Sequence, residues 1–137
     1  MVYDSDVLLV CVENAGRSRM AEAFFRKFAP ESLRVISGGT TPSEQLNPLV
    51  VRVMSEVGID MTNQKPKLLS SEMMEKSAKT VNMGCMDKAS CPVLLASDVL
   101  DWNISYPKGK SLDEIRKIRD QVKNKVLDLI DSLKAES

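Results

Sequence analysis

The apolar pattern of the chain opens with an unbroken run at residues 7–10, inside the segment 6–12. A run without polar alternation is typical of a strand buried on both faces of a parallel sheet. It ends at Cys11, and the stretch 12–16 separates it from a second apolar pattern, at helical spacing, that stops before Pro30. The second pattern consists of Met20, Ala21, Phe24, Phe25 and Phe28. The chain is therefore predicted to begin with a strand, a tight loop and a helix.

A second strand and a second helix follow. Residues 33–37 read as a short strand, and residues 38–39, both glycine, are expected in a turn near a ligand. The helix after them carries its own boundary signals, because Asn47 can cap it, Pro48 fits its first position and Gly58 fits its end. Its apolar stripe is Leu49, Val50, Val53, Met54 and Val57. These elements predict a second crossover connection.

The middle of the chain has weaker patterns. A shorter helix is expected to start at Ser70 or Ser71 and to run to about Lys76. Residues 80–83 then read as a third strand, which leads into a predicted loop at 84–92.

For the fourth strand, the sequence does not decide between residues 93–95 and residues 99–102. The last helix is the clearest element of the chain. Ser111 and Glu114 form a capping box at the start of that helix. One apolar face follows, made by Ile115, Ile118, Val122, Val126, Ile130 and Leu133. Alternating strands and helices imply right-handed crossovers and an α/β layer fold, with ligands expected where strands end and helices begin. Cys11 lies at such a point.

Composition and charge limit the function classes. Of the 137 residues, 43% are hydrophobic and 28% are charged, so we expect one soluble domain over residues 1–137. Lys plus Arg and Asp plus Glu both number 19, and the basic residues are scattered, which argues against nucleic acid or a membrane surface as partner. The apolar runs are far too short for a signal or spanning segment, so we expect a cytoplasmic protein.

Three cysteines and no histidine narrow the chemistry further. The reducing cytosol disfavours structural disulfides, so the cysteines are better read as reactive thiols. Without imidazole there is no Ser-His or Cys-His nucleophile pair, no histidine acid and no histidine-containing metal site. Three cysteines could hold zinc only with a carboxylate or water added, and we expect no metal site.

The central motif is the stretch 11–18, which reads Cys-Val-Glu-Asn-Ala-Gly-Arg-Ser. Backbone N–H groups of a loop between a strand and a helix can converge on one point, and the helix dipole adds positive potential there. Arg17 can then clamp two oxygens of a tetrahedral anion, and the same field favours a thiolate on Cys11. The candidate anion-binding residues are Val12, Glu13, Asn14, Ala15, Gly16, Arg17 and Ser18.

Three residues of this loop have expected supporting roles. Ser18 can hydrogen-bond the cysteine sulfur or cap the helix, and Asn14 can hold the loop in shape through its amide. Gly16 permits a backbone turn that most residues resist. In the alternative interpretation Cys11 only ends a buried strand and Arg17 lies on the surface. The strand before, the glycine inside and the helix beyond favour the anion-binding loop, because that chemistry requires each of them.

At these residues the chain resembles the low-molecular-weight protein tyrosine phosphatases and the arsenate reductases built on the same fold. Ser-Gly-Gly-Thr at 37–40, Gly-Ile-Asp at 58–60 and Pro-Lys-Leu at 66–68 resemble landmarks of that family at similar places. The resemblance covers nearly the whole chain. It implies an α/β three-layer sandwich with a central four-stranded parallel sheet.

Cys85 and Cys91 distinguish the branches of this family. The five residues between them let the two sulfurs meet if the loop bends, although free cysteines are also often just buried hydrophobes. Their segment resembles the Met-Gly-Cys and Cys-Pro pattern of thiol-coupled arsenate reductases. The resemblance implies that Cys11 attacks arsenate, that Cys85 then forms a disulfide with Cys11, and that Cys91 takes over to leave an accessible Cys85–Cys91 disulfide.

The resemblance also implies partners and an activity. The expected substrate is arsenate, with phosphate or sulfate as analogues, and the expected reductant is thioredoxin or another dithiol. We expect a monomer without a cofactor. The alternatives are a low-molecular-weight protein tyrosine phosphatase and a redox-sensing oxyanion-binding module. Some relatives suggest a monovalent cation near Asn14, Glu22 and Ser37, which the sequence leaves open.

One family feature is missing. Members usually carry an aspartate directly before a proline in a late loop, where it serves as general acid, but Tyr106 stands before Pro107 in this chain. Loss of a general acid typically costs about 100- to 10,000-fold in rate. Tyr106 itself is one candidate proton donor, and Trp102, nearby, is expected to serve packing.

Overall fold

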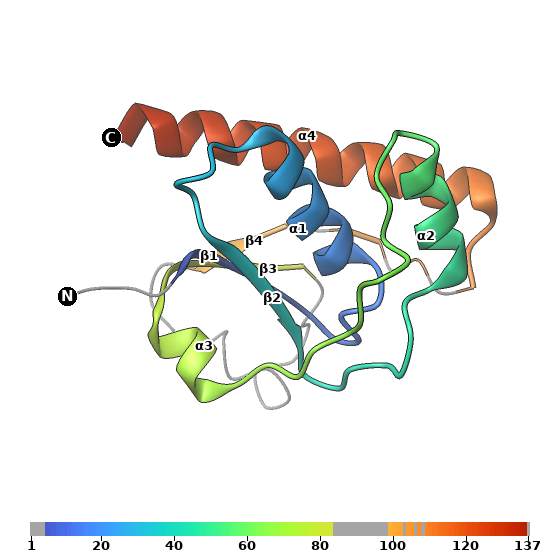
Figure 1. The fold of residues 1–137 in the computed structure, drawn as a ribbon, viewed down its shortest axis with the longest axis horizontal. Helices are drawn as coiled ribbons and strands as arrows, with labels where there is room; N and C mark the ends of the chain where they lie inside the picture. The colour runs from blue at the N-terminus through green and yellow to red at the C-terminus, as the bar shows by residue number, and fades with distance from the viewer. Residues whose placement is uncertain (1–4, 84–98, 103, 106, 108, 137) are drawn as a thin grey trace.

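The computed structural model describes residues 5–83, 99–102, 104–105, 107 and 109–136. The elements in these ranges are β1 (Ser5–Cys11), α1 (Arg17–Phe28), β2 (Val35–Gly39), α2 (Pro48–Ser55), α3 (Ser71–Glu75), β3 (Ser77–Asn82), β4 (Val99–Asp101) and α4 (Leu112–Glu136). Strands and helices alternate along most of this order, as the apolar pattern predicts (Figure 1).

The described strands form one parallel sheet in the order β2-β1-β3-β4. β1 lies between two neighbours, and residues 7–10 have no exposed surface, which explains their unbroken apolar run. Cys11 pairs with Gly39, and Val10 pairs with Asn82. The carboxyl ends of these strands therefore meet at one edge of the sheet. Cys11 lies there and begins the loop of residues 11–18 that is predicted to bind an anion, called the anion loop below.

Helices cover both faces of the sheet. α1, α2 and α4 lie on one face, and the short α3 lies on the other (Figure 1). Val7 and Leu9 point into the large core under the three helices, whereas Leu8 and Val10 join a small cluster with Leu69, Met73 and Met74. This alternation along one strand gives the α/β three-layer sandwich with a central four-stranded parallel sheet, so the predicted fold class is confirmed.

The predicted helix starts are confirmed, whereas α2 ends at Ser55 rather than at Val57 before Gly58. Asn47 caps α2 by accepting from the Leu49 N–H at 3.0 Å. Ser111 and Glu114 make reciprocal 3.2 Å bonds before α4, as the capping box requires. Ser70, the first of the two candidate residues, caps α3.

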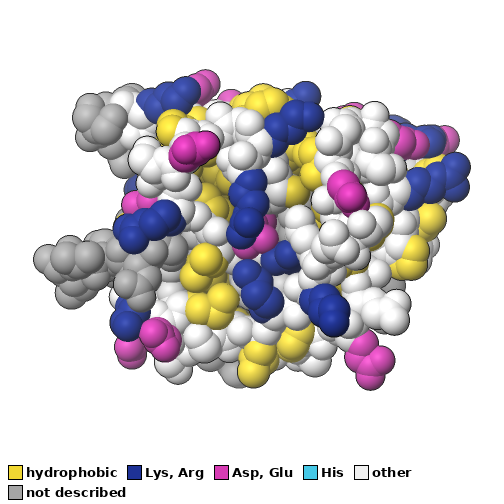
Figure 2. Space-filling view, in the orientation of Figure 1, with side chains coloured by type: hydrophobic (Ala, Val, Ile, Leu, Met, Phe, Trp, Pro, Cys, Tyr) yellow, Lys and Arg dark blue, Asp and Glu magenta, His cyan; other side chains and the backbone are white. Residues whose placement is uncertain are grey.

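Long-range ion pairs tie α4 to the end of α2. Glu56 accepts from Arg116 at 2.7 Å and from Arg119 at 3.0 Å. Among the described helices, none has both the length and the apolar character needed to cross a membrane. Basic and acidic side chains are interspersed over the face drawn in Figure 2, so no large single-sign patch covers it.

The predicted strand boundaries were wrong in two places. β2 starts at Val35 and includes both glycines, which were expected in a turn after residues 33–37. Close packing explains why these two strand positions are glycine. A Cβ on Gly38 would lie 3.0 Å from the Leu69 Cα, and one on Gly39 would lie 2.6 Å from the Val12 oxygen. β3 likewise begins at Ser77 rather than at residue 80.

For the fourth strand, the second candidate is confirmed, since β4 spans Val99–Asp101. The other candidate, 93–95, and the predicted loop 84–92 lie outside the described residues. Trp102 is 8% exposed and belongs to the core, as expected.

Candidate active site

The loop between β1 and α1 is held from outside by the segment that follows β2. Thr41 and Ser43 donate their N–H groups to the carbonyls of Val12 and Glu13 at 2.8 and 3.0 Å. Two further bonds run from Thr40 to the Cys11 carbonyl at 3.2 Å and from Asn47 to the Ala15 carbonyl at 3.0 Å. A trans peptide directs its N–H opposite to its carbonyl, so the loop amides that follow these carbonyls face away from this segment. That orientation suits an anion-binding loop.

The Cys11 sulfur accepts hydrogen bonds from inside the loop. The Asn14 N–H lies 3.2 Å from Sγ, and the Ser18 hydroxyl lies 2.8 Å from it. Asn14 Oδ1 accepts from the Lys67 N–H at 2.8 Å, which directs the amide Nδ2 toward Ser18 Oγ at 2.6 Å and Ser37 Oγ at 3.1 Å. Because the Ser18 oxygen already accepts from Asn14, its hydrogen is available to the sulfur. Two hydrogen-bond donors thus face the Cys11 sulfur.

Asn14 has a positive φ. Its φ of 51° lies in the left-handed region, which asparagine tolerates better than most residues. Gly16 has a φ of −145° and a ψ of −89°, a backbone conformation that is neither helical nor extended. Gly16 is needed for close packing, since a Cβ there would lie 2.8 Å from Pro107 Cγ. Ser18 bonds the sulfur, while the helix N-cap is Gly16, so the first of the two roles expected for Ser18 holds.

Arg17 lies at the first position of α1 and is buried. Its Nη1 donates to the Ile104 carbonyl at 3.1 Å, so a residue late in the chain helps to hold the guanidinium in place. A donor-rich planar guanidinium fixed in this way can present its other N–H groups to a tetrahedral anion. The structure therefore brings Cys11 and Arg17 together at one cavity.

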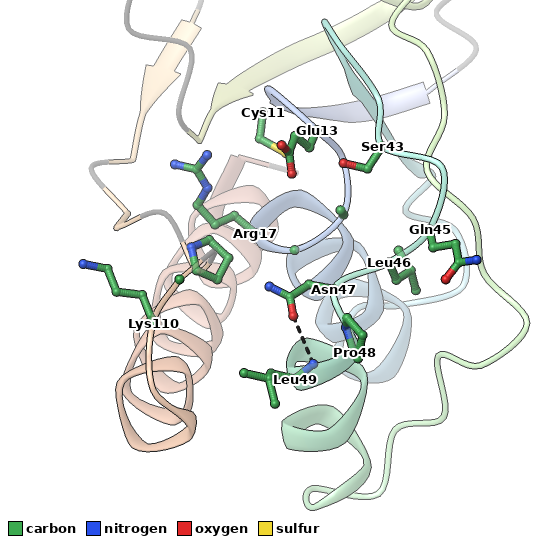
Figure 3. Close-up of a pocket in the computed structure, with 14 residues that line it drawn as sticks. Cys11, Glu13, Arg17, Ser43, Gln45, Leu46, Asn47, Pro48, Leu49 and Lys110 are labelled. Carbon is green, nitrogen blue, oxygen red and sulfur yellow. Dashed lines mark hydrogen bonds between the residues drawn. The ribbon is translucent and has the colours of Figure 1, made fainter.

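The cavity has a volume of about 790 Å³, and Figure 3 shows how its lining residues converge. From the loop it is lined by Cys11, Glu13, Ala15, Gly16 and Arg17, and from elsewhere by Ser43, Gln45, Leu46, Asn47, Pro48, Leu49, Pro107, Gly109 and Lys110. The other predicted loop residues contribute differently. Asn14 and Ser18 are fully buried behind the sulfur, and Val12 does not line the cavity.

Sequence reasoning missed the part of the cavity wall that is made by Ser43 and residues 45–49. It read Asn47 and Pro48 only as the start of a helix, although this segment leaves the carboxyl end of β2 beside the end of β1. The rule that ligands bind where parallel strands end was the signal that could have found it. Lys110 was missed as well, because nothing local marks it as different from other lysines.

A buried ion pair lies beside the loop. Arg19 Nη1 donates to Glu22 Oε2 at 2.8 Å and to Ser37 Oγ at 3.3 Å, and its Nη2 donates to Gln64 at 2.5 Å. Burial lowers the pKa of the Arg19 guanidinium, and the Glu22 carboxylate opposes this shift. Lys67 Nζ adds a second positive charge 3.5 Å from the other oxygen of Glu22. The Arg19 guanidinium thus lies between Glu22 and Ser37. This is the place where the sequence left open the binding of a monovalent cation.

Some predicted site residues lie outside the described part of the chain. Cys85, Cys91 and Tyr106 are among them, so the structure places only Cys11 of the three cysteines. Within the described ranges, no group of three or more Cys, Asp or Glu side chains could hold a metal ion.

Replacing Asn14 with alanine should lower the free energy of unfolding by about 3 kcal/mol. The change leaves the Lys67 N–H and two buried serine hydroxyls without their amide partner and puts a less tolerant residue at positive φ. Urea denaturation measures the loss. Asn63→Ala, at an exposed turn, is the matched control and should change stability by less than about 0.5 kcal/mol. Equal effects of the two variants would contradict a special role for Asn14.

Comparison with known proteins finds similar sequences and structures over most of the chain. A Halobacterium salinarum relative, provisionally named as an arsenate reductase, is 35% identical over 127 residues, which cover 89% of this chain and 88% of the relative. A solved arsenate reductase in its phosphate-binding state is 29% identical with a TM-score of 0.82, covering 93% of this chain and 98% of that one.

A thioredoxin-dependent arsenate reductase from Corynebacterium glutamicum is 30% identical with a TM-score of 0.81. The match covers 98% of this chain and 64% of that one, so the present chain spans somewhat less than two thirds of that structure. Residues 6–137 match the family described as low molecular weight phosphotyrosine protein phosphatase. With this match over nearly its whole length, the chain belongs to the low molecular weight phosphotyrosine protein phosphatase family.

Proposed function

We propose that this protein is an arsenate reductase that converts arsenate to arsenite by thiol chemistry. The observation that carries the proposal is the Cys11 sulfur, which faces two hydrogen-bond donors at a cavity that it shares with Arg17. The relatives named as arsenate reductases support the choice of substrate within the family.

The first step uses Cys11, Arg17 and the loop between them, which are the part of the site that the structure describes. The amides of residues 12–18 and the Arg17 guanidinium bind the oxygens of arsenate, so that arsenic lies in front of the Cys11 sulfur. The Cys11 thiolate attacks arsenic, an S–As bond forms and an As–O bond breaks. Positioning and fixed positive charge lower the barrier, because the charge that moves to the oxygens is met by donors already in place.

The second half is a thiol relay through Cys85 and Cys91. The Cys85 thiolate attacks the Cys11 sulfur, the S–As electron pair stays on arsenic, and arsenite leaves as As(V) becomes As(III). The two thiols lose two electrons and form the Cys11–Cys85 disulfide. Cys91 then attacks Cys85, which frees Cys11 and leaves a Cys85–Cys91 disulfide for thioredoxin or another dithiol to reduce.

The remaining parts of the proposal concern organisation. Residues 1–137 act as a single catalytic domain, which the continuous core beneath α1, α2 and α4 supports. The enzyme works as a cytoplasmic monomer without a resident cofactor, since the thiols supply both electrons. Phosphate and sulfate compete with arsenate, because they present the same tetrahedral oxygens.

The relay is tested by following NADPH oxidation with arsenate, thioredoxin and thioredoxin reductase. The parent is expected to turn over repeatedly, whereas Cys85→Ser should release no arsenite. Cys91→Ser should release one arsenite per protein and then stop with a Cys11–Cys85 disulfide, which mass spectrometry of the unreduced protein detects. Protection of Cys11 from iodoacetamide by phosphate should be the same in all three proteins, which shows that the anion site is intact. Multiple turnovers by Cys91→Ser would contradict the relay.

The family name makes phosphatase activity the second candidate function. Loops of this kind can pass a phosphoryl group to the cysteine and then to water, without help from other thiols. Hydrolysis of p-nitrophenyl phosphate that survives Cys85→Ser and Cys91→Ser, together with no arsenite release by the parent, would favour the phosphatase. Reversible oxidation without turnover of either substrate would favour a redox-sensing oxyanion-binding module.

A further inference from the structure

The proposed first step needs a proton donor. Oxygen leaves arsenate as water only if a group protonates it, and the family's usual aspartate is replaced by Tyr106 in this sequence. Among the described residues that line the cavity, Glu13 carries the only carboxyl group. We propose that Glu13 is the general acid that protonates the departing oxygen when Cys11 attacks. This inference rests on the proposed function and names the missing catalytic group.

The main chain around Glu13 is fixed. Its carbonyl accepts from the Ser43 N–H at 3.0 Å, and the next residue, Asn14, donates its N–H to the Cys11 sulfur at 3.2 Å. The Glu13 side chain is half-buried, and its carboxylate points into the cavity on the side of the Cys11 sulfur (Figure 3). The acid is therefore anchored to the same rigid loop as the nucleophile and does not depend on the placement of a separate late loop.

The charges in the cavity suit this role. Arg17 and Lys110, which also line it, favour the ionised carboxylate when the cavity holds no anion. A bound arsenate and the Cys11 thiolate oppose a third negative charge and favour the protonated form of Glu13. The carboxyl group would repel the substrate if it stayed ionised, whereas in its protonated form it donates a hydrogen bond to a substrate oxygen. Substrate binding therefore favours uptake of a proton from solvent by Glu13, which prepares Glu13 to act as the acid.

The atoms and charges of this step balance. The Cys11 thiolate, singly charged arsenate and the neutral Glu13 acid react to give the Cys11–arsenate adduct, one water and the Glu13 carboxylate. The S–As bond forms, the As–OH bond breaks and the Glu13 proton joins the departing hydroxide. Arsenic stays As(V), so this step transfers no electrons. Solvent returns the proton to Glu13 before the next turnover.

Glu13→Gln tests the assignment because it keeps the shape and removes the proton. We expect kcat/KM for arsenate to fall by about 100- to 10,000-fold, while phosphate still protects Cys11 from iodoacetamide. The parent should lose activity at alkaline pH as the acid ionises, and the variant should lack this limb of its pH profile. Glu13→Asp should keep part of the rate. Glu44→Gln, an exposed carboxyl in the neighbouring segment that does not line the cavity, is the matched control and should behave as the parent.

Tyr106→Phe separates the two candidate acids. If it removes the alkaline limb and Glu13→Gln does not, Tyr106 is the acid and the proposal is overturned. A Glu13→Gln protein with the rate and pH profile of the parent would overturn it as well. Thermal unfolding of each variant, together with Cys11 protection by phosphate, excludes misfolding as the cause of a lost rate.

Phosphate esters separate this inference from the proposed function. Protonation matters most for a poor leaving group, so Glu13→Gln should slow hydrolysis of phenyl phosphate more than that of p-nitrophenyl phosphate. This comparison involves neither Cys85 nor Cys91. A parent that releases no arsenite but shows this difference would contradict the arsenate reductase function and support Glu13 as the general acid. A parent inactive on arsenate and on both esters would overturn both proposals.

Discussion

Replacing Arg17 with lysine is expected to lower kcat/KM for arsenate by about 100- to 1,000-fold while leaving the fold intact. The guanidinium is buried and donates to the Ile104 carbonyl, which holds it in place, and in the proposed function this planar group binds the anion. Lysine keeps the charge but offers a single ammonium, which cannot bond the carbonyl and two substrate oxygens with the same geometry. Steady-state kinetics over a range of arsenate concentrations measure the loss.

Arg52→Lys is the matched control, because Arg52 is exposed on α2 and does not line the cavity. It should leave the kinetics unchanged. The Arg17 variant should also lose most of the protection that phosphate gives Cys11 against iodoacetamide, because the same donors bind both anions. An Arg17→Lys protein with the KM and kcat of the parent would show that backbone amides alone hold the substrate.

Replacing Gly39 with alanine is expected to cost about 2 kcal/mol of folding free energy and to change the reactivity of Cys11. The added Cβ would lie 2.6 Å from the Val12 oxygen and 2.9 Å from the Asn14 nitrogen, and both are backbone atoms that cannot rotate away. The Asn14 N–H is a donor to the Cys11 sulfur, so the displaced loop should bind the thiolate less well. Urea denaturation gives the stability, and the rate of iodoacetamide alkylation across pH gives the reactivity.

Gly38→Ala provides a close comparison one position earlier in β2. Its Cβ would meet the Leu69 Cα at 3.0 Å, on the segment beside the sheet, and would meet no atom of the anion loop within the three nearest contacts. It should cost less stability, about 1 kcal/mol, and leave the alkylation rate of Cys11 unchanged. A similar change in Cys11 reactivity for both variants would mean that Gly39 has no special link to the loop.

The buried polar groups beside the loop explain why several segments must come together for this site. Asn14 contacts Lys67 and Ser37, which come from two different parts of the chain. The Lys67 carbonyl also accepts from the Gly39 N–H at 2.8 Å, so the segment 65–69 is bonded to both β2 and the anion loop. These contacts fix the orientation of the Asn14 amide. Its Nδ2 therefore points toward the Ser18 hydroxyl, which bonds the Cys11 sulfur. The reactivity of Cys11 thus depends on residues far from it in sequence.

Features that rest on local patterns could be predicted from the amino-acid sequence alone. The unbroken apolar run of β1, the cap at Asn47 and the capping box of Ser111 and Glu114 act within a few residues, so they were predicted with nearly correct boundaries. The pairing of Cys11 with Arg17 was predicted for the same reason, because the loop and helix that bring them together are adjacent in the chain. The family membership that these residues indicated is confirmed.

Features that depend on contacts between distant residues required the folded structure. Folding put the glycines of β2 inside the strand, gave Asn14 a positive φ, and placed the Arg19 guanidinium between Glu22 and Ser37. It also brought Ser43, residues 45–49 and Lys110 to the cavity. Close packing and hydrogen-bond direction arise between residues that meet only after folding, and no pattern along the chain records which atoms will approach one another.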